Sequence, residues 1–286
     1  MSTAPPGPSP RRGDLGLRVL ALAATALLVL LLALPFLGLL ARVTPAALLA
    51  RLGQPNVRAA LRLSLVTSAG ATAVVALLGT PAAWLLATRE FPGRRPLEVL
   101  VDLPMVMPPT VAGFALLLAF GRMGLAGRAL SALGVSLPFT TLGVVVAQAF
   151  MAVPFYVGAA RAGFASVDPR LVEAAATLRA GEWVRFRRVV LPLAAPSLLA
   201  GLAMAGARAL GEFGATITFA GNLPGTTQTM PLAVYVALND DLDAAVVLSV
   251  LLVLLSAGLL VGLRAARPGG LWGGPRAGRP GSAPVR

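Results

Sequence analysis

Residues 168–192 read DPRLVEAAATLRAGEWVRFRRVVLP, a polar stretch between two long apolar segments. Asp168 suits the cap of a helix, and Pro169 suits its first position. Apolar residues then follow at helical spacing and share one face: Leu171, Ala175 and Leu178. Gly181 is expected to end this first helix.

A second short helix is predicted from Glu182 towards Val190, with Pro192 ending it. Arginines lie on the outer faces of both helices. Two such helices between apolar segments are typical of a docking platform on one side of a membrane. A plain helical hairpin with no docking role is the alternative.

The composition of the whole chain is that of a membrane protein. Hydrophobic residues make up 57% and charged residues 12%, whereas soluble chains carry about 25% charged residues. All 24 basic residues are arginine, so the lysine of a P-loop is absent, and there is no cysteine and no histidine. We therefore expect neither an ATPase nor a metalloenzyme, and no cofactor.

The predicted fold class is an all-α polytopic membrane protein with six transmembrane helices. The expected spans are about 17–40, 60–88, 97–120, 141–160, 193–214 and 244–263. Disordered cytoplasmic tails are expected at 1–16 and 264–286, and a cytoplasmic loop at 161–192. The first span is too long for the apolar core of a signal peptide, so we expect an uncleaved helix.

The arginines predict the orientation of the spans. Seventeen of the 24 fall on the side that holds both tails and residues 161–192, and six fall on the other side. Positive charge accumulates on the cytoplasmic side, so both termini are expected to be cytoplasmic. Four arginines in the first outer loop run against this trend, although Arg58 and Arg62 fit the start of an interfacial helix.

The third span is interrupted by Pro104, Pro108 and Pro109. Proline removes backbone donors, and lipid offers no partner for the freed carbonyls. Broken helices of this kind often mark substrate pathways. A packing kink with no role in transport explains the pattern equally well.

Arg208 and Glu212 fall within the predicted fifth span, where a charge costs roughly 2.5–3.5 kcal/mol on insertion scales. Their spacing places both on one helix face. One interpretation is a self-compensating ion pair that fixes packing. The other is a charged pair on the permeation path, with Arg208 meeting an anion.

Glu173-Ala174-Ala175, followed by Val189, Leu191 and Pro192, resembles the EAA loop of ABC importer membrane subunits. In that family the loop forms coupling helices that enter a groove of the ATPase. The expected glycine of the motif is replaced by Arg179, and Gly181 is expected to take over the turn. The resemblance implies that Glu173, Ala174, Ala175, Arg179, Gly181 and Pro192 couple the chain to an ATPase.

Three further segments resemble molybdate-type ABC permeases, within a similarity that spans roughly residues 58–263. They are LPMVMPPTV at 103–111, RALGEFGAT at 208–216 and FAGNLPGTTQTMPLAVY at 219–235. The resemblance implies a type I ABC importer permease for molybdate, and tungstate is an open possibility. It also implies an ATP-binding subunit dimer, an extracytoplasmic oxyanion-binding protein and a homodimer. The candidate translocation path or gate comprises Pro104, Pro108, Pro109, Thr110, Arg208 and Glu212.

Other functions stay open at this point. The stretch GEFG is shared with sulfate permeases, so a sulfate or other oxyanion permease is an alternative. A secondary transporter would carry ionisable residues in several spans, and only Arg208, Glu212 and Asp102 are present. A membrane scaffold would need neither the broken span nor the polar platform.

Overall fold

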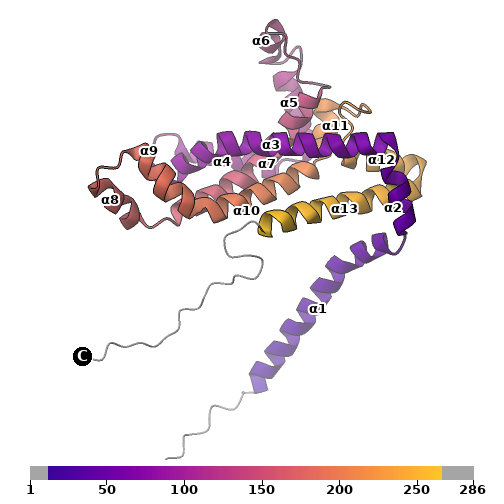
Figure 1. The fold of residues 1–286 in the computed structure, drawn as a ribbon, viewed down its shortest axis with the longest axis horizontal. Coiled ribbons are helices and arrows are strands. Elements are labelled where there is room, and N and C mark those ends of the chain that lie inside the picture. The colour runs from indigo at the N-terminus through magenta and orange to yellow at the C-terminus, as the bar shows by residue number, and fades with distance from the viewer. Residues whose placement is uncertain (1–11, 266–286) are drawn as a thin grey trace, which may run out of the picture.

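The computed structural model describes residues 12–265. Its elements are helical: α3 (Pro55–Thr88), α7 (Thr141–Ala165), α10 (Leu191–Leu210) and α13 (Leu242–Ala265) run side by side (Figure 1). The predicted tails at 1–16 and 264–286 lie outside the described residues, except that α1 already begins at Arg12 and α13 continues to Ala265.

Small residues bring the central helices into close contact. A Cβ atom on Gly79 of α3 would lie 2.9 Å from the Tyr156 ring, and one on Gly201 of α10 would lie 3.2 Å from it. The Tyr156 hydroxyl is 2.6 Å from the hydroxyl of Thr80. The tyrosine therefore joins α3, α7 and α10 in the main apolar core.

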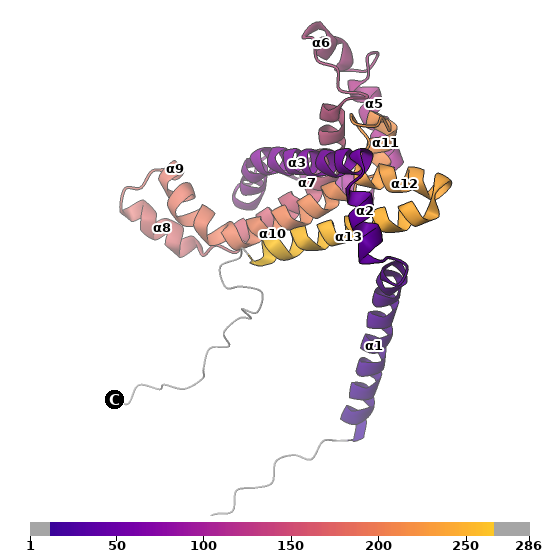
Figure 2. The ribbon, with the colours of Figure 1, turned by 45° about the vertical axis from the view of Figure 1, so that its right-hand side comes forward.

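The first helix stands apart from the bundle. α1 (Arg12–Leu40) is linked to α3 by the short α2 (Pro45–Leu52) and projects away from the other helices (Figure 2). Its 18-residue apolar window has no buried residue. Its large apolar side chains are thus left for lipid or another chain.

Five helices of the described residues are long and apolar enough to cross a membrane. They are Gly16–Leu40, Pro55–Thr88, Thr141–Ala165, Glu182–Leu210 and Leu242–Leu259. The predicted third span is two shorter helices, α4 (Arg94–Val106) and α5 (Pro109–Phe120). Pro104 is buried inside α4, and the break falls at Met107 and Pro108.

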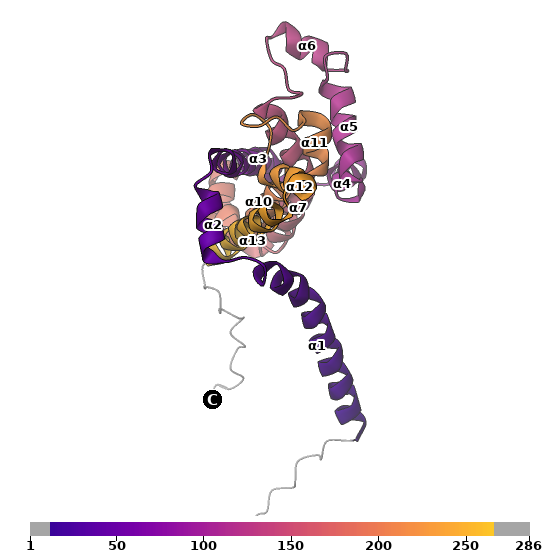
Figure 3. The same cartoon turned by 90° about the vertical axis from the view of Figure 1, so that its right-hand side faces the viewer.

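The connections hold more helix than the sequence predicted. The 121–140 loop contains α6 (Gly127–Ala132), which projects with the end of α5 beyond the bundle (Figure 3). The loop predicted at 215–243 contains α11 (Gly214–Ala220) and α12 (Met230–Asp240). The fifth span ends at Leu210, four residues before its predicted end, because the chain leaves helical geometry at Gly211.

The prediction that Pro192 ends the second platform helix is wrong. α9 (Glu182–Arg185) continues through a π-helical turn, η1 (Phe186–Val190), directly into α10. Within η1 the N–H of Leu191 bonds to the carbonyl of Phe186. Pro192, which lacks an N–H, directly follows this wider turn inside the continuous helix and does not end it.

Candidate functional site

The polar platform begins as the sequence predicted. Asp168 caps α8 (Pro169–Thr177), and its carboxylate accepts the N–H of Arg170 at 2.9 Å. Pro169 occupies the first turn of the helix. This capping fixes the point at which the chain turns away from α7.

The prediction that Gly181 takes over the turn after α8 is wrong. Arg179 itself adopts the left-handed conformation, with φ of 58°. The Arg179 N–H bonds to the carbonyl of Ala176, and the Ala180 N–H bonds to that of Ala175. This is the Schellman arrangement, in which glycine is the usual residue at the left-handed position. Gly181 instead has φ of −61° and precedes α9.

The two faces of α8 have different surroundings. Val172, Glu173 and Ala176 line a cavity of 580 Å³ beneath the helix. On the opposite face Ala174 is exposed, Leu171 is half exposed and Leu178 is 83% exposed. The exposed apolar face is the one available to a partner, whereas Glu173 is set towards the cavity.

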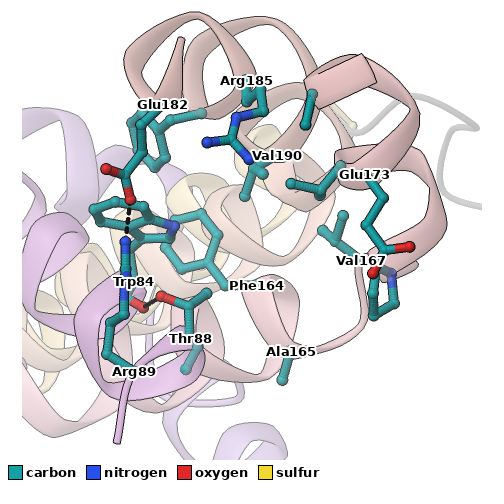
Figure 4. A pocket seen from close by; sticks show the side chains of 15 residues that line it. Trp84, Thr88, Arg89, Phe164, Ala165, Val167, Glu173, Glu182, Arg185 and Val190 are labelled. Carbon is teal, nitrogen blue, oxygen red and sulfur yellow. Dashed lines mark hydrogen bonds and ion pairs between the residues drawn. The ribbon is translucent and has the colours of Figure 1, made fainter. Parts of the chain in front are cut away.

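The cavity is walled by the ends of α3 and α7 and by η1 (Figure 4). Arg89 at the end of α3 pairs with Glu182 at the start of α9. Phe186 lies against three aromatic rings, with centroid distances of 5.1 Å to Trp84, 5.8 Å to Trp183 and 6.1 Å to Phe164. These contacts fasten the platform to the bundle.

Sequence reasoning missed these anchoring residues. Two of the contacts join residues far apart in the chain: Arg89 is 93 positions from Glu182, and Trp84 lies even farther from Phe186. The run of aromatic and arginine residues at 183–188 was the available indication, but it did not identify Trp84 or Phe164 as partners.

The two interrupted segments predicted as a path or gate meet in space. A Cβ atom on Gly214, at the start of α11, would lie 2.6 Å from Pro109 Cβ and 3.3 Å from the Thr110 nitrogen. One turn further, a Cβ atom on Gly113 would lie 2.6 Å from the carbonyl oxygen of Ala215. We call residues 107–108 and 211–213 the paired helix breaks.

Arg208 and Glu212 lie at this point, but not on one helix as predicted. Arg208 is in the last turn of α10, and Glu212 follows the helix end. The Arg208 Nη1 lies 2.5 Å from Glu212 Oε2, and Glu212 Oε1 accepts the N–H of Ala215 at 2.8 Å. Glu212 is 1% exposed and Arg208 is 25% exposed. The carboxylate therefore joins the end of α10 to the first turn of α11.

The predicted site residues thus fall into two groups. Those of the platform lie around α8 and α9, and those of the candidate gate lie at the paired helix breaks. Between them runs α10, whose 20 residues span about 30 Å. The Pro108, Pro109 and Thr110 side chains are exposed, whereas Pro104 is buried away from this surface.

A second charged contact lies where α12 meets α13. Arg51 Nη2 donates to Asp241 Oδ2 at 2.7 Å, and the N–H of Ala244 donates to Oδ1 at 3.0 Å. The backbone bond from Ala244, followed by the bond from Arg51, lowers the pKa of Asp241 below its ordinary 3.8. One of the arginines in the first loop is therefore neutralised locally.

A family model described as "binding-protein-dependent transport system inner membrane component" matches residues 78–267. This match covers more than half of the chain and includes both groups of site residues. The chain belongs to this family. The permease is thus a multi-pass inner-membrane component, not itself catalytic, of a system with ATPase and binding-protein partners.

Curated relatives agree with this assignment. The permease is 45% identical over 240 residues to the molybdenum transport system permease protein ModB of Mycobacterium tuberculosis, covering 82% of this chain and 89% of the relative. It is 37% identical over 207 residues to the sulfate transport system permease protein CysT of Escherichia coli, covering 72% and 74%.

The fold is also that of a solved transporter. The permease superposes with a TM-score of 0.72 on a chain of a bacterial ABC transporter involved in the import of the acidic polysaccharide alginate. The match covers 88% of this chain and 94% of that chain, at 15% sequence identity. At this identity the likeness concerns the fold alone.

Proposed function

We propose that the permease moves molybdate into the cell by alternating access, driven by ATP hydrolysis in a partner subunit. The observation that carries the proposal is the 45% identity to a molybdenum permease over 82% of the chain. Tungstate has the same charge and shape as molybdate and is included in the proposal. Sulfate is the second candidate, supported by the 37% identity to a sulfate permease.

The proposed topology has six crossings, with both termini in the cytoplasm. Five crossings are the long apolar helices, and the third combines α4 and α5 across the break at Met107 and Pro108. Lipid does not satisfy the backbone groups freed at such a break, so this segment belongs against protein or water. The arginine distribution supports the orientation.

We further propose that the permease works as a homodimer. In one copy, large apolar side chains of α4 and α5 are exposed beside the paired helix breaks: Leu100, Met105, Val106, Val111, Phe114 and Leu118. A second copy placed against this face would enclose the breaks between the two subunits. The path would then be lined by Pro108, Pro109 and Thr110, with the partly exposed Arg208 beside it.

The platform residues are proposed to couple this bundle to the ATPase. The exposed face of α8, with the small side chain of Ala174, would enter the ATPase groove. Because α9, η1 and α10 form one continuous helix, a displacement of the platform reaches Arg208 without an intervening loop. The Arg89–Glu182 pair and the Phe186 cluster prevent the platform from moving alone. Each subunit would therefore rock as a rigid body.

The cargo is tested by uptake of labelled molybdate, tungstate and sulfate into vesicles that carry the reconstituted permease, ATPase and binding protein. Molybdate accumulation that requires ATP, and that excess sulfate does not suppress, is the expected result. Preferential sulfate accumulation would assign the permease to the second candidate. Uphill uptake by the permease alone would contradict the whole proposal.

A further inference from the structure

Gln148, two turns into α7, is a fully buried side chain whose polar atoms have no hydrogen-bond partner within the part of the chain that the structure describes. Its exposed fraction is 0%, and neither the amide oxygen nor the amide nitrogen has a hydrogen-bond partner among the described residues. A buried amide without hydrogen bonds is costly, because it has lost its contacts with water and gained none. Such a group calls for a partner that protein atoms do not supply.

The packing of α7 places Gln148 beside the paired helix breaks. A Cβ atom on Gly201 would lie 3.0 Å from Ala159 Cβ, and one on Gly163 would lie 2.5 Å from Ser197 Cβ. The two helices are therefore antiparallel in a fixed register. Continued to Leu210, the last residue of α10, this register brings the helix end level with Phe150, so Glu212 follows close to the level of Gln148.

The short helix α11 also packs along α7, and it runs antiparallel to α7 as α10 does. A Cβ atom on Gly143 would lie 3.6 Å from Ala220 Cβ. One turn along each helix, Thr216 is level with Ala147, the neighbour of Gln148. The Thr216 side chain is also fully buried, and its hydroxyl has no hydrogen-bond partner among the described residues.

Glu212 is the third buried polar group at this level. Its Oε1 is bonded to the Ala215 N–H, while Oε2 has the Arg208 guanidinium as ion-pair partner and no hydrogen bond. Gln148, Thr216 and Glu212 come from three different segments. The helix registers place these residues at nearly the same level of the core, where Ala147 and Ala215, their chain neighbours, belong to one apolar cluster.

We propose that Gln148, Thr216 and Glu212 enclose a buried hydration site that holds ordered water at the paired helix breaks. The three groups offer both donors and acceptors, which suits water, and water needs two to four polar partners. An anion would meet the Glu212 carboxylate. A cation would compete with Arg208, which already neutralises that carboxylate.

The water gives Gln148 a positioning role. It links α7 to Glu212, and through Glu212 it holds Arg208 and the first turn of α11. Gln148 is then a positioning residue for the candidate gate, although it is enclosed in the core and does not reach the surface of the path. The hydration site does not depend on which oxyanion is carried. The proposal of this site can therefore be tested independently of the proposed cargo.

Gln148→Met and Thr216→Val remove the polar atoms at nearly constant volume. If the two side chains share water, each change lowers the melting midpoint of the permease–ATPase complex by on the order of 5 °C. The double variant should then lose less than the sum of the two. Tyr156→Phe is the control, because it removes a buried hydroxyl of α7 that is paired with Thr80; its effect should add to that of Gln148→Met.

Two further measurements distinguish a positioning role of Gln148 from a role in stability alone. Gln148→Met should slow ATP-driven uptake without changing the concentration of loaded binding protein that gives half-maximal rate, and Gln148→Asn should restore part of the rate. A density map that resolves water should show it between the three side chains. Additive effects of Gln148→Met and Thr216→Val, a higher melting midpoint for Gln148→Met, or a dry site would overturn the proposal.

Discussion

The two ends of the long helix that runs from α9 to α10 each carry an arginine–glutamate ion pair, in opposite surroundings. At the platform, Arg89 and Glu182 are 57% and 54% exposed. At the paired helix breaks, Arg208 and Glu212 are 25% and 1% exposed. An exposed pair contributes about 0–1 kcal/mol, whereas removal of one partner of a buried pair costs about 3–5 kcal/mol.

The difference shows that the two ends are adapted to different tasks. The platform presents exposed apolar side chains, and its own contacts are individually weak, as suits a surface that binds a partner. The breaks are closely packed at Gly113 and Gly214, and the buried Glu212 carboxylate there is paired with Arg208. On the proposed mechanism, the ATPase would push on the platform, and the resulting movement would change the packing at the paired helix breaks.

The largest effect is expected from substitutions that stop the platform from binding the ATPase and leave the paired helix breaks unchanged. Ala175→Trp is expected to abolish ATP-driven uptake while the protein still inserts and folds, because α8 could no longer dock closely. Glu173→Lys is expected to do the same, because it reverses a charge in the cavity between α8 and the bundle. Uptake into vesicles and the yield of folded complex are the measurements. Leu78→Trp, at a site 65% exposed on α3, is the control and should transport normally. Normal transport by both platform variants would remove the coupling role.

Loss of the buried charge partner tests the other end. Arg208→Ala leaves Glu212 uncompensated and should destabilise the permease by about 3–5 kcal/mol, measured by thermal unfolding of the purified complex. Glu182→Ala, at the exposed pair, should cost no more than about 1 kcal/mol. Equal costs would contradict the contrast. If Arg208→Ala and Glu212→Ala each left assembly and uptake intact, the pair would have no gate role.

Close backbone contact at the breaks predicts a smaller effect. Gly113→Ala places a Cβ atom 2.6 Å from the Ala215 carbonyl oxygen and 2.8 Å from Thr218 Cβ. The forced separation of α5 and α11 should cost about 1–3 kcal/mol and reduce uptake. Gly158→Ala on α7 is the matched control, since a Cβ atom there meets nothing within 4 Å. A neutral Gly113→Ala would refute tight packing at the breaks.

At the platform, the left-handed Arg179 predicts a gain in stability. Arg179→Gly relieves a conformation that costs an ordinary residue about 1–2 kcal/mol, so the unfolding temperature should rise slightly. Gly181→Ala should have little effect, because Gly181 has an ordinary backbone and open space around it. A destabilising Arg179→Gly would show that the arginine side chain makes a needed contact.

The smallest expected effect is a loss of stability at acidic pH through Asp241. Because bonds from Ala244 and Arg51 lower the pKa of Asp241, its carboxylate stabilises the fold above the ordinary pKa of 3.8. That contribution is lost as the pH falls through the lower pKa of the folded state. Wild type and Asp241→Asn should therefore differ in melting temperature at neutral pH and converge below about pH 4. A constant difference across this range would contradict the assignment.

The sequence predicted the helical class, five long apolar helices and the cap at Asp168, because these depend on local periodicity and capping. It misplaced the turn after α8, since the hydrogen bonds from Arg179 and Ala180 outweigh the cost of a left-handed arginine. It also misjudged Pro192, which lies inside a continuous helix directly after a π-helical turn.

Contacts between distant segments were beyond the sequence. Glu212 was expected to share a helix face with Arg208, but the bond that fixes it is to the Ala215 N–H of the next helix. The residues of the two broken spans were predicted separately, and their meeting through Pro109 and Gly214 is a property of the fold. The sequence also gave no sign that Gln148 has a structural role, because an isolated glutamine in an apolar helix does not reveal which segments pack around it.

The central claim is that the platform and the paired helix breaks of one copy move as a single body. The chain has no cysteine. Single labels at Arg95→Cys, in the first turn of α4, and at Leu223→Cys, in the loop after α11, therefore report directly on the assembled dimer. Pulsed electron resonance distances between the two copies should shorten at 95 and lengthen at 223 when ATP binds. A change at 95 with an unchanged distance at 223 would contradict the account.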